Sequence, residues 1–290
     1  MKVLARAKIN LWLSVGPRRG EGLHEIVSVM QSVSLADELR LDVADQTTLD
    51  VSPPGAAPED DTNLIVRAVK ALRASTGADS GVAMRVEKRI PMAAGLAGGS
   101  ADAAAALVGL NELWGTRLSR KALERIGASI GSDVPFCIRG GTAMVRGAGE
   151  DLSPLACPRE LWWVLASDGT ELSTADVYAR RDELGLLESA DPYELSDALA
   201  RADSAGIAAN LRNDLAEAAV SLSPGIAFTR DALLDAGAIG VGLSGSGSAW
   251  FGLARGEQHA SHIARRIASR TNVCWVDVAI SLPQGAWIVE

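Results

Sequence analysis

Cysteine is scarce in this sequence of 290 residues, which contains only Cys137, Cys157 and Cys274. The number is odd, the spacing is wide, and the sequence has no Cys-x-x-Cys pair. These features argue against a disulfide framework and against a cysteine-ligated zinc site. We expect three reduced, partly buried thiols in a cytoplasmic protein.

Long apolar runs are also absent. No segment reaches the ~18 consecutive apolar residues that a membrane-spanning helix needs. Residues 1–10 carry Lys2, Arg6 and Lys8 with no apolar core behind them, which is not the pattern of a secretory signal peptide. We therefore expect a cytoplasmic location and no membrane partner.

The chain has no excess of positive charge, because its formal net charge is −8. An acidic protein repels nucleic acid, so we expect no nucleic-acid partner. An anionic small molecule can still bind where basic residues gather. The sequence does not reveal the oligomeric state, for which our expectation is a monomer or a weak dimer. The basic residues that can gather are Arg6, Lys8, Arg18, Arg19, Lys88 and Arg89.

The most informative segment that is present runs from Pro91 to Asp102 and is rich in glycine and alanine. It joins an expected strand at 82–88 to a strongly helical run at 101–113. Small residues at such a junction let the backbone approach a ligand, and the helix start offers unpaired N–H groups and a positive dipole end. These features favour a phosphate site.

Tight packing explains such a turn about as well as phosphate binding does, because short glycine motifs have a high false-positive rate. The segment is not a Walker A loop, since no Gly-Lys-Ser/Thr ends it. It also lacks the glycine spacing and the later acidic residue of a dinucleotide fingerprint. The segment therefore predicts a nucleotide or another phosphorylated ligand.

Three polar residues suit phosphoryl transfer if they meet. Residues 3–13 alternate in polarity, which predicts a strand with one buried face and places Lys8 and Asn10 together on the other. Taken singly, Lys8 can be a solvated edge lysine and Asp133 a turn residue. A carboxylate beside a lysine and a phosphate loop can accept a hydroxyl proton while the lysine stabilises negative charge. Pro135 disfavours a helix at the residue before it, so we expect Asp133 in a loop.

Two other features carry weaker signals. His24 follows a glycine-rich loop without metal-ligand spacing around it, so we predict no metal ion bound by protein side chains alone. Residues 244–248 can cradle an anion, although a tight turn between two strands explains them equally well.

The order of predicted strands and helices indicates an α+β fold in two domains. Strands alternate with helices in the second half, which favours a compact α+β sandwich. Prolines at 154–158 interrupt the pattern, so we predict one domain at 1–156 and another at 157–290. The final strand can pack back on the first domain.

Three motifs in this order resemble the superfamily of galactokinase, homoserine kinase, mevalonate kinase and phosphomevalonate kinase, the GHMP kinases. They are Ala-Lys-Ile-Asn-Leu at 7–11, residues 91–104, and Ser-Gly-Ser-Gly at 244–247. Each motif alone is modest, but their order and spacing are specific.

Within the superfamily the chain is most similar to the 4-diphosphocytidyl-2-C-methyl-D-erythritol kinase family. The segments that carry this similarity are Arg18-Arg19, Gly-Leu-His at 22–24, Thr-Asn-Leu-Ile-Val-Arg-Ala at 62–68 and Gly-Ser-Asp-Val-Pro-Phe at 131–136. The similarity extends from about residue 2 to residue 253. It implies an N-terminal domain of ribosomal-protein-like type for ATP binding and catalysis, a C-terminal ferredoxin-like domain, and an active site between them.

The resemblance also implies ATP-dependent phosphorylation of the 2-hydroxyl of a cytidine-diphosphate sugar alcohol in isoprenoid precursor synthesis. It implies Asp133 as the base, Lys8 as its support, Mg²⁺ with the ATP, and Ser100 as a candidate magnesium ligand. The implied substrate-binding residues are Asn10, His24, Thr174, Tyr178, Gly245 and Gly247, with His24 bonded to the cytosine and Tyr178 against the cytidine. The implied ATP-binding residues are Asn63, Lys88, Pro91, Met92, Ala93, Ala94, Gly95, Leu96, Ala97, Gly98, Gly99, Ser100 and Ala101, with Asn63 and Lys88 near the adenine.

The chain departs from the family pattern in two places. The family has a tyrosine where this chain has Leu23, and losing its stacking on cytosine costs on the order of 1 kcal/mol. Tyr178 or Trp12 can supply that stacking. Alanines also replace usual glycines of the phosphate loop, which predicts fewer positive-φ positions there. They are Ala93, Ala94 and Ala97.

Three alternatives stay open. Another GHMP kinase, acting on homoserine or mevalonate, would share the glycine loop but leave the Lys8 strand and Gly-x-His unexplained. An RNA-binding module of ribosomal-protein type conflicts with the acidic charge. An inactive ATP sensor conflicts with the presence of both Lys8 and Asp133.

Overall fold

The structure is a computed structural model that describes most of the chain. The predictions about Arg19, Gly22 and Leu23 lie outside the described residues. The described residues are 1–18, 24–147, 149–157, 160–185 and 191–289.

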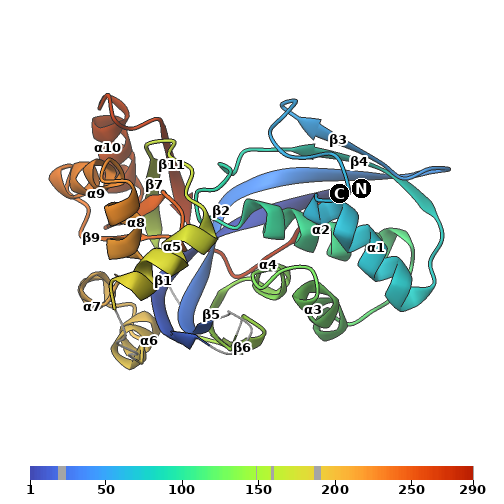
Figure 1. The fold of residues 1–290 in the computed structure, drawn as a ribbon, viewed down its shortest axis with the longest axis horizontal. Helices are drawn as coiled ribbons and strands as arrows, with labels where there is room; N and C mark the ends of the chain where they lie inside the picture. Colours follow the sequence, from blue (N-terminus) through green and yellow to red (C-terminus); the bar gives the residue numbers. More distant parts are fainter. Residues whose placement is uncertain (19–23, 148, 158–159, 186–190, 290) are drawn as a thin grey trace.

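Two long strands, β1 (Lys2–Arg18) and β2 (His24–Ala44), form an antiparallel pair that connects two lobes (Figure 1). The pairing register shifts on either side of Lys8 and Asn10. Irregularities of this kind re-aim side chains and are common next to active sites. Burial alternates along residues 2–6, as predicted for a strand with one buried face. The prediction was wrong for residues 7–16, which are buried on both faces.

These strands belong to the larger of two sheets, which has eight strands. Its other members are β3 (Thr48–Ser52), β4 (Gly81–Glu87), β5 (Thr142–Gly147), β6 (Asp151–Pro154), β8 (Arg212–Asn213) and β12 (Trp287–Ile288). The order is β12-β1-β2-β4-β3, while β5 pairs with β2 and β6, and β8 pairs with β1. Because β8 and β12 come from the second half of the chain, both halves build this sheet, and the two chain ends lie together (Figure 1).

The smaller sheet has four antiparallel strands in the order β11-β7-β10-β9. They are β7 (Trp162–Ser167), β9 (Gly240–Leu243), β10 (Trp250–Ala254) and β11 (Trp275–Ile280). Helix α10 (Glu257–Ala268) connects β10 to β11 and packs on β7 and β11. This order, with the first strand next to the last, is the predicted ferredoxin-like arrangement. The domain boundary near 154–158 stays a prediction.

Helix α2 (Gly98–Leu113) is central and buried, as its apolar sequence predicts. It packs against α1, α4, β1 and β2, and it starts three residues before the predicted run at 101–113. The other helices of the first half are α1 (Leu64–Thr76), α3 (Arg120–Ala128) and α4 (Val134–Arg139). Those of the second half are α5 (Thr174–Glu183), α6 (Tyr193–Ala200), α7 (Ser204–Ala209), α8 (Ala216–Leu222) and α9 (Ile226–Asp235).

Helix α4 corrects one prediction. It begins directly after Asp133 and contains Pro135 in its first turn, so the proline does not keep its neighbour out of a helix. Proline is tolerated there because the first N–H groups of a helix need no partner within the helix. Asp133 is therefore the N-cap residue of α4, held at the start of a helix.

No disulfide joins cysteines among the described residues: Cys137 is buried, Cys157 is half-buried and Cys274 is exposed. Burial raises the pKa of the Cys137 thiol, which keeps it protonated. Among the residues that the structure describes, no helix combines the length and the apolar character needed to cross a membrane.

A buried hydrogen bond links the two sheets through the core. The indole Nε1 of Trp163 in β7 donates to Gln31 Oε1 in β2 at 2.8 Å, and both residues are fully buried. Gln31 Nε2 in turn donates to Thr142 Oγ1 at 3.0 Å, while the Trp163 ring meets Phe251 edge-on. This hydrogen bond therefore fixes the position of one lobe relative to the other within an otherwise apolar contact.

Replacing Trp163 by phenylalanine removes this donor and leaves a void in the core. We expect the free energy of unfolding to fall by about 2 to 4 kcal/mol, since a buried acceptor loses its partner. Urea denaturation followed by circular dichroism measures it. Trp287→Phe, at an exposed position, is the matched control and should change the value by less than about 0.5 kcal/mol. Equal values for the two variants would contradict the link between the sheets.

Candidate active site

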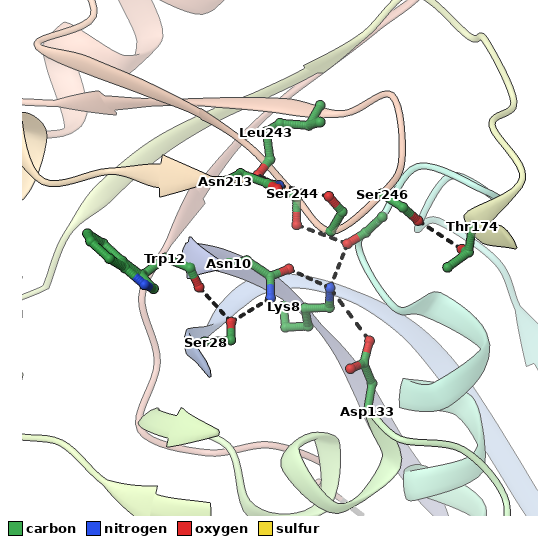
Figure 2. Close-up of polar contacts among 12 residues, drawn as sticks. Lys8, Asn10, Trp12, Ser28, Asp133, Thr174, Asn213, Leu243, Ser244 and Ser246 are labelled. Atoms are coloured by element: carbon green, nitrogen blue, oxygen red, sulfur yellow. Dashed lines mark hydrogen bonds and ion pairs between the residues drawn. The ribbon is translucent and has the colours of Figure 1, made fainter. Parts of the chain in front are cut away.

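Lys8 occupies the centre of a polar cluster between the lobes (Figure 2). Its side-chain Nζ donates to Asn10 Oδ1 at 2.7 Å and to the carbonyl oxygen of Gly95 at 2.8 Å, and lies 3.6 Å from Asp133 Oδ2. Lys8 is only 3% exposed. A buried ammonium is costly unless it is paired and hydrogen-bonded, and these contacts meet that condition. The predicted meeting of Lys8, Asn10 and Asp133 with the glycine loop is therefore present.

Asn10 is fixed in turn by β2. Its Nδ2 donates to Ser28 Oγ at 2.9 Å, and Ser28 Oγ donates to the carbonyl oxygen of Trp12 at 2.6 Å (Figure 2). The amide is thus oriented with its oxygen toward Lys8. This chain of bonds holds the ammonium in one position before any ligand arrives.

The loop at 91–97 and the loop at 244–248 pack backbone against backbone. Ser244 Oγ donates to the carbonyl oxygen of Gly95 at 2.9 Å, the same atom that Lys8 contacts. A Cβ on Gly95 would lie 1.9 Å from the carbonyl oxygen of Ser244, and a Cβ on Gly247 would lie 2.1 Å from Ala94. The glycines at 95 and 247 therefore permit contact between the loops.

The position of the second loop is set by side chains from α5 and β8. Asn213 Nδ2 donates to the carbonyl oxygens of Leu243 and Gly245 at 2.8 and 2.7 Å, and Thr174 Oγ1 lies 2.8 Å from Ser246 Oγ (Figure 2). Elements of the second half therefore hold a loop whose Ser244 hydroxyl bonds to the same Gly95 carbonyl oxygen as Lys8.

The loop at 91–97 has left-handed backbone conformations at two of its alanines. Ala93 and Ala97 have φ of 51° and 59°, and Gly95 between them has φ of 79°. The prediction of fewer positive-φ positions was therefore wrong for Ala93 and Ala97. Left-handed alanine costs roughly 1 to 2 kcal/mol per residue, so the surrounding contacts over-determine this geometry. Of the three replaced glycines, Ala94 does not have a positive φ.

A buried ionic network supports both ends of this loop. Lys88 Nζ bonds to carboxylates of Asp37 and Asp102, and Asp37 Oδ1 accepts from the backbone N–H groups of Arg89 and Ile90. Burial raises the pKa of Asp102 to about 8, although the Lys88 charge opposes it. Burial acts to lower the pKa of Lys88, but both carboxylates outweigh it and the pKa is raised. The strand before the loop is thereby tied to the helix after it.

The polar cluster lines the first of two adjoining cavities. The first, of about 530 Å³, and the second, of about 750 Å³, share Ile26, Ser132, Thr174 and Tyr178. Of the predicted site residues, His24 lines only the second cavity, and Ala101 and Gly247 line neither. Those that line the first cavity alone are Lys8, Asn10, Asn63, Lys88, 91–100, Asp133 and Gly245.

Tyr178 and His24 lie side by side at the second cavity, with ring centroids 5.3 Å apart. Burial, followed by the charge of Asp133, raises the pKa of Tyr178 to about 12, so its hydroxyl stays protonated.

Asn63, predicted near the adenine, is the N-cap of α1: its Oδ1 accepts from the Ile65 N–H at 2.8 Å.

Sequence reasoning missed several residues of the site. Asp102 closes the glycine segment but had no assigned role, and Asp37 gives no sequence signal because it lies far away on β2. Asp182 contacts His24 at the second cavity. Its spacing of four from Tyr178 on a predicted helix places both on one face, which is the signal that could have found it.

Models of one protein family match both halves of the chain. Residues 63–141 match the GHMP kinases N terminal domain, and residues 195–273 match the GHMP kinases C terminal region. A 4-diphosphocytidyl-2-C-methyl-D-erythritol kinase from Gloeobacter violaceus is 46% identical to the chain over 92% of it and 90% of the relative. The chain belongs to this family of kinases. A relative of the same name from Nocardia farcinica is 42% identical over 99% of the chain and 96% of its own length.

Solved structures agree with this family assignment. A crystal structure of 4-(cytidine 5'-diphospho)-2C-methyl-D-erythritol kinase superposes with a TM-score of 0.81 at 35% identity, covering 97% of the chain and all of the other. Homoserine kinase from Cytophaga hutchinsonii has a TM-score of 0.78 at 21% identity, over 100% of the chain and 97% of its own, and shares the fold. The predicted two-domain α+β fold of the GHMP kinases is confirmed.

The contact between the two loops predicts that alanine at Gly95 destabilises the protein far more than alanine at Gly99. Gly95→Ala combines a positive φ with a clash against backbone, so we expect the free energy of unfolding to fall by at least about 2 kcal/mol. Gly99→Ala is the control, because its Cβ would lie 3.6 Å from Leu64 inside a helix, and it should change stability by less than about 1 kcal/mol. Thermal and urea denaturation of both variants measure these changes in the free energy of unfolding. A tolerated Gly95→Ala would disprove the close contact.

Proposed function

We propose that the chain transfers the γ-phosphoryl group of ATP to the 2-hydroxyl of 4-diphosphocytidyl-2-C-methyl-D-erythritol, a step of isoprenoid precursor synthesis. The observation that carries this proposal is the position of Lys8 and Asp133 in the first cavity, which shares Ser132, the neighbour of Asp133 in sequence, with the second. A donor and an acceptor bound in adjoining cavities would meet at this pair.

The first cavity suits ATP. Its wall contains the loop at 91–97 and the N-terminus of α2, whose free N–H groups and dipole favour phosphate. Asn63 and Lys88 line the same cavity and are assigned to the adenine side. Ala101 is buried behind this wall, so it supports the helix start rather than touching the nucleotide.

The second cavity suits the cytidyl group. His24 supplies polar atoms and Tyr178 an aromatic ring, while Thr174 lies where the cavities meet. Asn10 and Gly245 line the first cavity next to Lys8, which is the place for the erythritol end of the substrate. Gly247 contributes by shaping the loop that touches Gly95.

The chemistry follows from the Lys8–Asp133 pair. The substrate oxygen forms a bond to the γ-phosphorus, the bond from that phosphorus to the bridging oxygen of ADP breaks, and the hydroxyl proton passes to Asp133. Lys8 stabilises the negative charge on the transferred group and orients the carboxylate. Asn10 and the Gly95 carbonyl oxygen fix the ammonium, so little reorganisation is needed during transfer.

Magnesium would accompany the ATP. Ser100 lines the first cavity, and Asp102 next to it has a buried Oδ1 without a hydrogen-bond partner among the described residues. A hydroxyl and a carboxylate are oxygen ligands, which Mg²⁺ prefers together with phosphates and water, so these residues fit the ion. Bound there, Mg²⁺ would neutralise phosphate charge.

Three further expectations stand beside this function: a cytoplasmic enzyme, no nucleic-acid partner, and a monomer or weak dimer. The scarcity of cysteine supports the first and the net charge of −8 supports the second.

A substrate panel tests the proposal. The purified chain is mixed with ATP and Mg²⁺ and with the cytidyl alcohol, homoserine or mevalonate, and ADP release is followed. Turnover with the cytidyl alcohol alone is the expected result. Turnover only with homoserine or mevalonate would move the chain to another GHMP activity, and no turnover with any of them would contradict a kinase of this group.

Replacing Asp133 by asparagine removes the base but keeps the size of the side chain. We expect kcat to fall by roughly 10²- to 10⁴-fold, the range typical of a lost general base, with ATP affinity unchanged. ADP release and calorimetric ATP binding measure the two quantities. Asp45→Asn, an exposed residue outside both cavities, should match the wild type. Near-normal turnover in the Asp133 variant would refute its role.

Lys8→Met keeps an apolar stem and removes the ammonium. If the lysine acts mainly on the transition state, kcat falls by roughly 10²-fold or more while KM changes little. Lys70→Met, at an exposed position of α1, serves as the control in the same kinetic assay. A rise in KM with unchanged kcat would make Lys8 a docking residue instead.

A further inference from the structure

A segment from the second half of the chain contacts both of the elements that carry Lys8 and Asp133. Residues 281–289 leave β11 in the smaller sheet, cross to the larger sheet and include β12, beside the N-terminus (Figure 1). None of these residues lines either cavity. Any influence of the segment on the reaction must therefore pass through the residues that it contacts.

On one side the segment binds α4 through its backbone. The Ala286 N–H donates to the carbonyl oxygen of Cys137 at 2.7 Å, and the Cys137 N–H donates to the carbonyl oxygen of Asp133 at 3.0 Å. The segment and Asp133 are thus joined by two hydrogen bonds through a single residue. Because the hydrogen bonds of an α-helix run along its axis, a shift of α4 at this contact would be passed to the residue at its start.

On the other side the segment is anchored to the strands of the Lys8 site. The Leu282 N–H donates to the carbonyl oxygen of Ser32 at 3.0 Å, and Ser32 lies opposite Lys8 in the pairing of β1 with β2. Further along the segment, β12 pairs with β1, where Ile288 lies opposite Val3. Backbone bonds therefore fix the segment to the larger sheet before and after its contact with α4.

A glycine makes the contact with α4 close. A Cβ on Gly285 would lie 2.2 Å from the Cys137 carbonyl oxygen and 2.8 Å from the Gly140 nitrogen, which are backbone atoms at the end of α4. Gly285 does not have a positive φ, so the contact, and not the backbone conformation, requires glycine here. A methyl group would push the two backbones apart by roughly 1 Å, because non-bonded atoms in contact lie about 3.5 Å apart.

We propose that residues 281–289 are a positioning element that sets the separation of Asp133 from Lys8 for phosphoryl transfer. This inference rests on the proposed function, because that function makes Asp133 the base. A misplacement of about 1 Å can lower a rate on the order of 100-fold even when its cause lies far from the chemistry. Since the segment lines neither cavity, substrate binding should depend on it far less than turnover does.

Gly285→Ala tests the proposal by separating the segment from α4. We expect kcat for the cytidyl alcohol to fall by roughly ten- to a hundredfold, with KM for both substrates within about threefold of the wild type. Arg139 of α4 still pairs with Glu124 of α3 at 2.8 Å, so we expect the variant to fold, which circular dichroism checks. An unchanged kcat in the folded variant would overturn the inference.

Gly225→Ala is the matched control. Gly225 has a φ of −59°, its Cβ would lie 3.6 Å from Asp168 Oδ2, and it lines neither cavity. The same substitution is therefore made without a clash and away from the site. It should leave kcat and KM at the wild-type values.

A double-mutant cycle distinguishes positioning of the base from general damage. If the segment acts through Asp133, Gly285→Ala should lower kcat by less than about threefold in an Asp133→Asn background, where the base is already gone. An equal fold loss in both backgrounds would overturn the inference. If Asp133→Asn alone keeps near-normal turnover, the base assignment fails and the inference fails with it, so the cycle reports the two failures separately.

Hydrogen exchange of the wild type, followed by NMR, tests the contact without any substitution. The amide hydrogens of Ala286 and Cys137 should exchange through the same opening of the structure, with protection factors within about threefold of each other. Rapid exchange at Ala286 while Cys137 stays protected would show that α4 keeps its place without the segment. That result would overturn the inference.

Discussion

A buried positive charge is the constraint on which the site depends. The ammonium of Lys8 is removed from water and must be compensated within the protein. Its partners come from three places: Asn10 on the same strand, the Gly95 carbonyl oxygen in the phosphate loop, and Asp133 at the start of α4. A shift in any of these elements would leave the charge uncompensated. The same cation that would serve the chemistry therefore also fixes the local structure.

The second constraint is steric and joins the two halves of the chain. The loops at 91–97 and 244–248 touch through their backbones, so glycine is needed at the contact points. The Trp163–Gln31 hydrogen bond and the pairing of β8 and β12 with β1 hold the lobes at the spacing this contact requires. The cleft between the lobes is built as one unit, with each lobe supplying one wall.

Much of the site could be predicted from the sequence because short local patterns determine it. The strand that carries Lys8, the glycine segment and the apolar helix behind it are set by periodicity and small residues, and the order of the motifs identified the family. Other features depend on distant partners. The left-handed alanines at 93 and 97 flank residues 94 and 95, which pack against the second loop, and the Asp37–Lys88–Asp102 network joins a strand, a loop and a helix. No local pattern encodes such contacts. The start of α4 was misjudged because a proline rule for helix interiors was applied at a helix start.

A crystal structure with a non-hydrolysable ATP analogue and the cytidyl alcohol would test the central claim most directly. The account predicts the Asp133 carboxylate within hydrogen-bonding reach, about 3 Å, of the 2-hydroxyl, which would point at the γ-phosphorus beside Lys8. A complex in which both ligands are bound in reactive alignment, yet Asp133 lies more than about 5 Å from that hydroxyl and another group contacts it, would contradict the account.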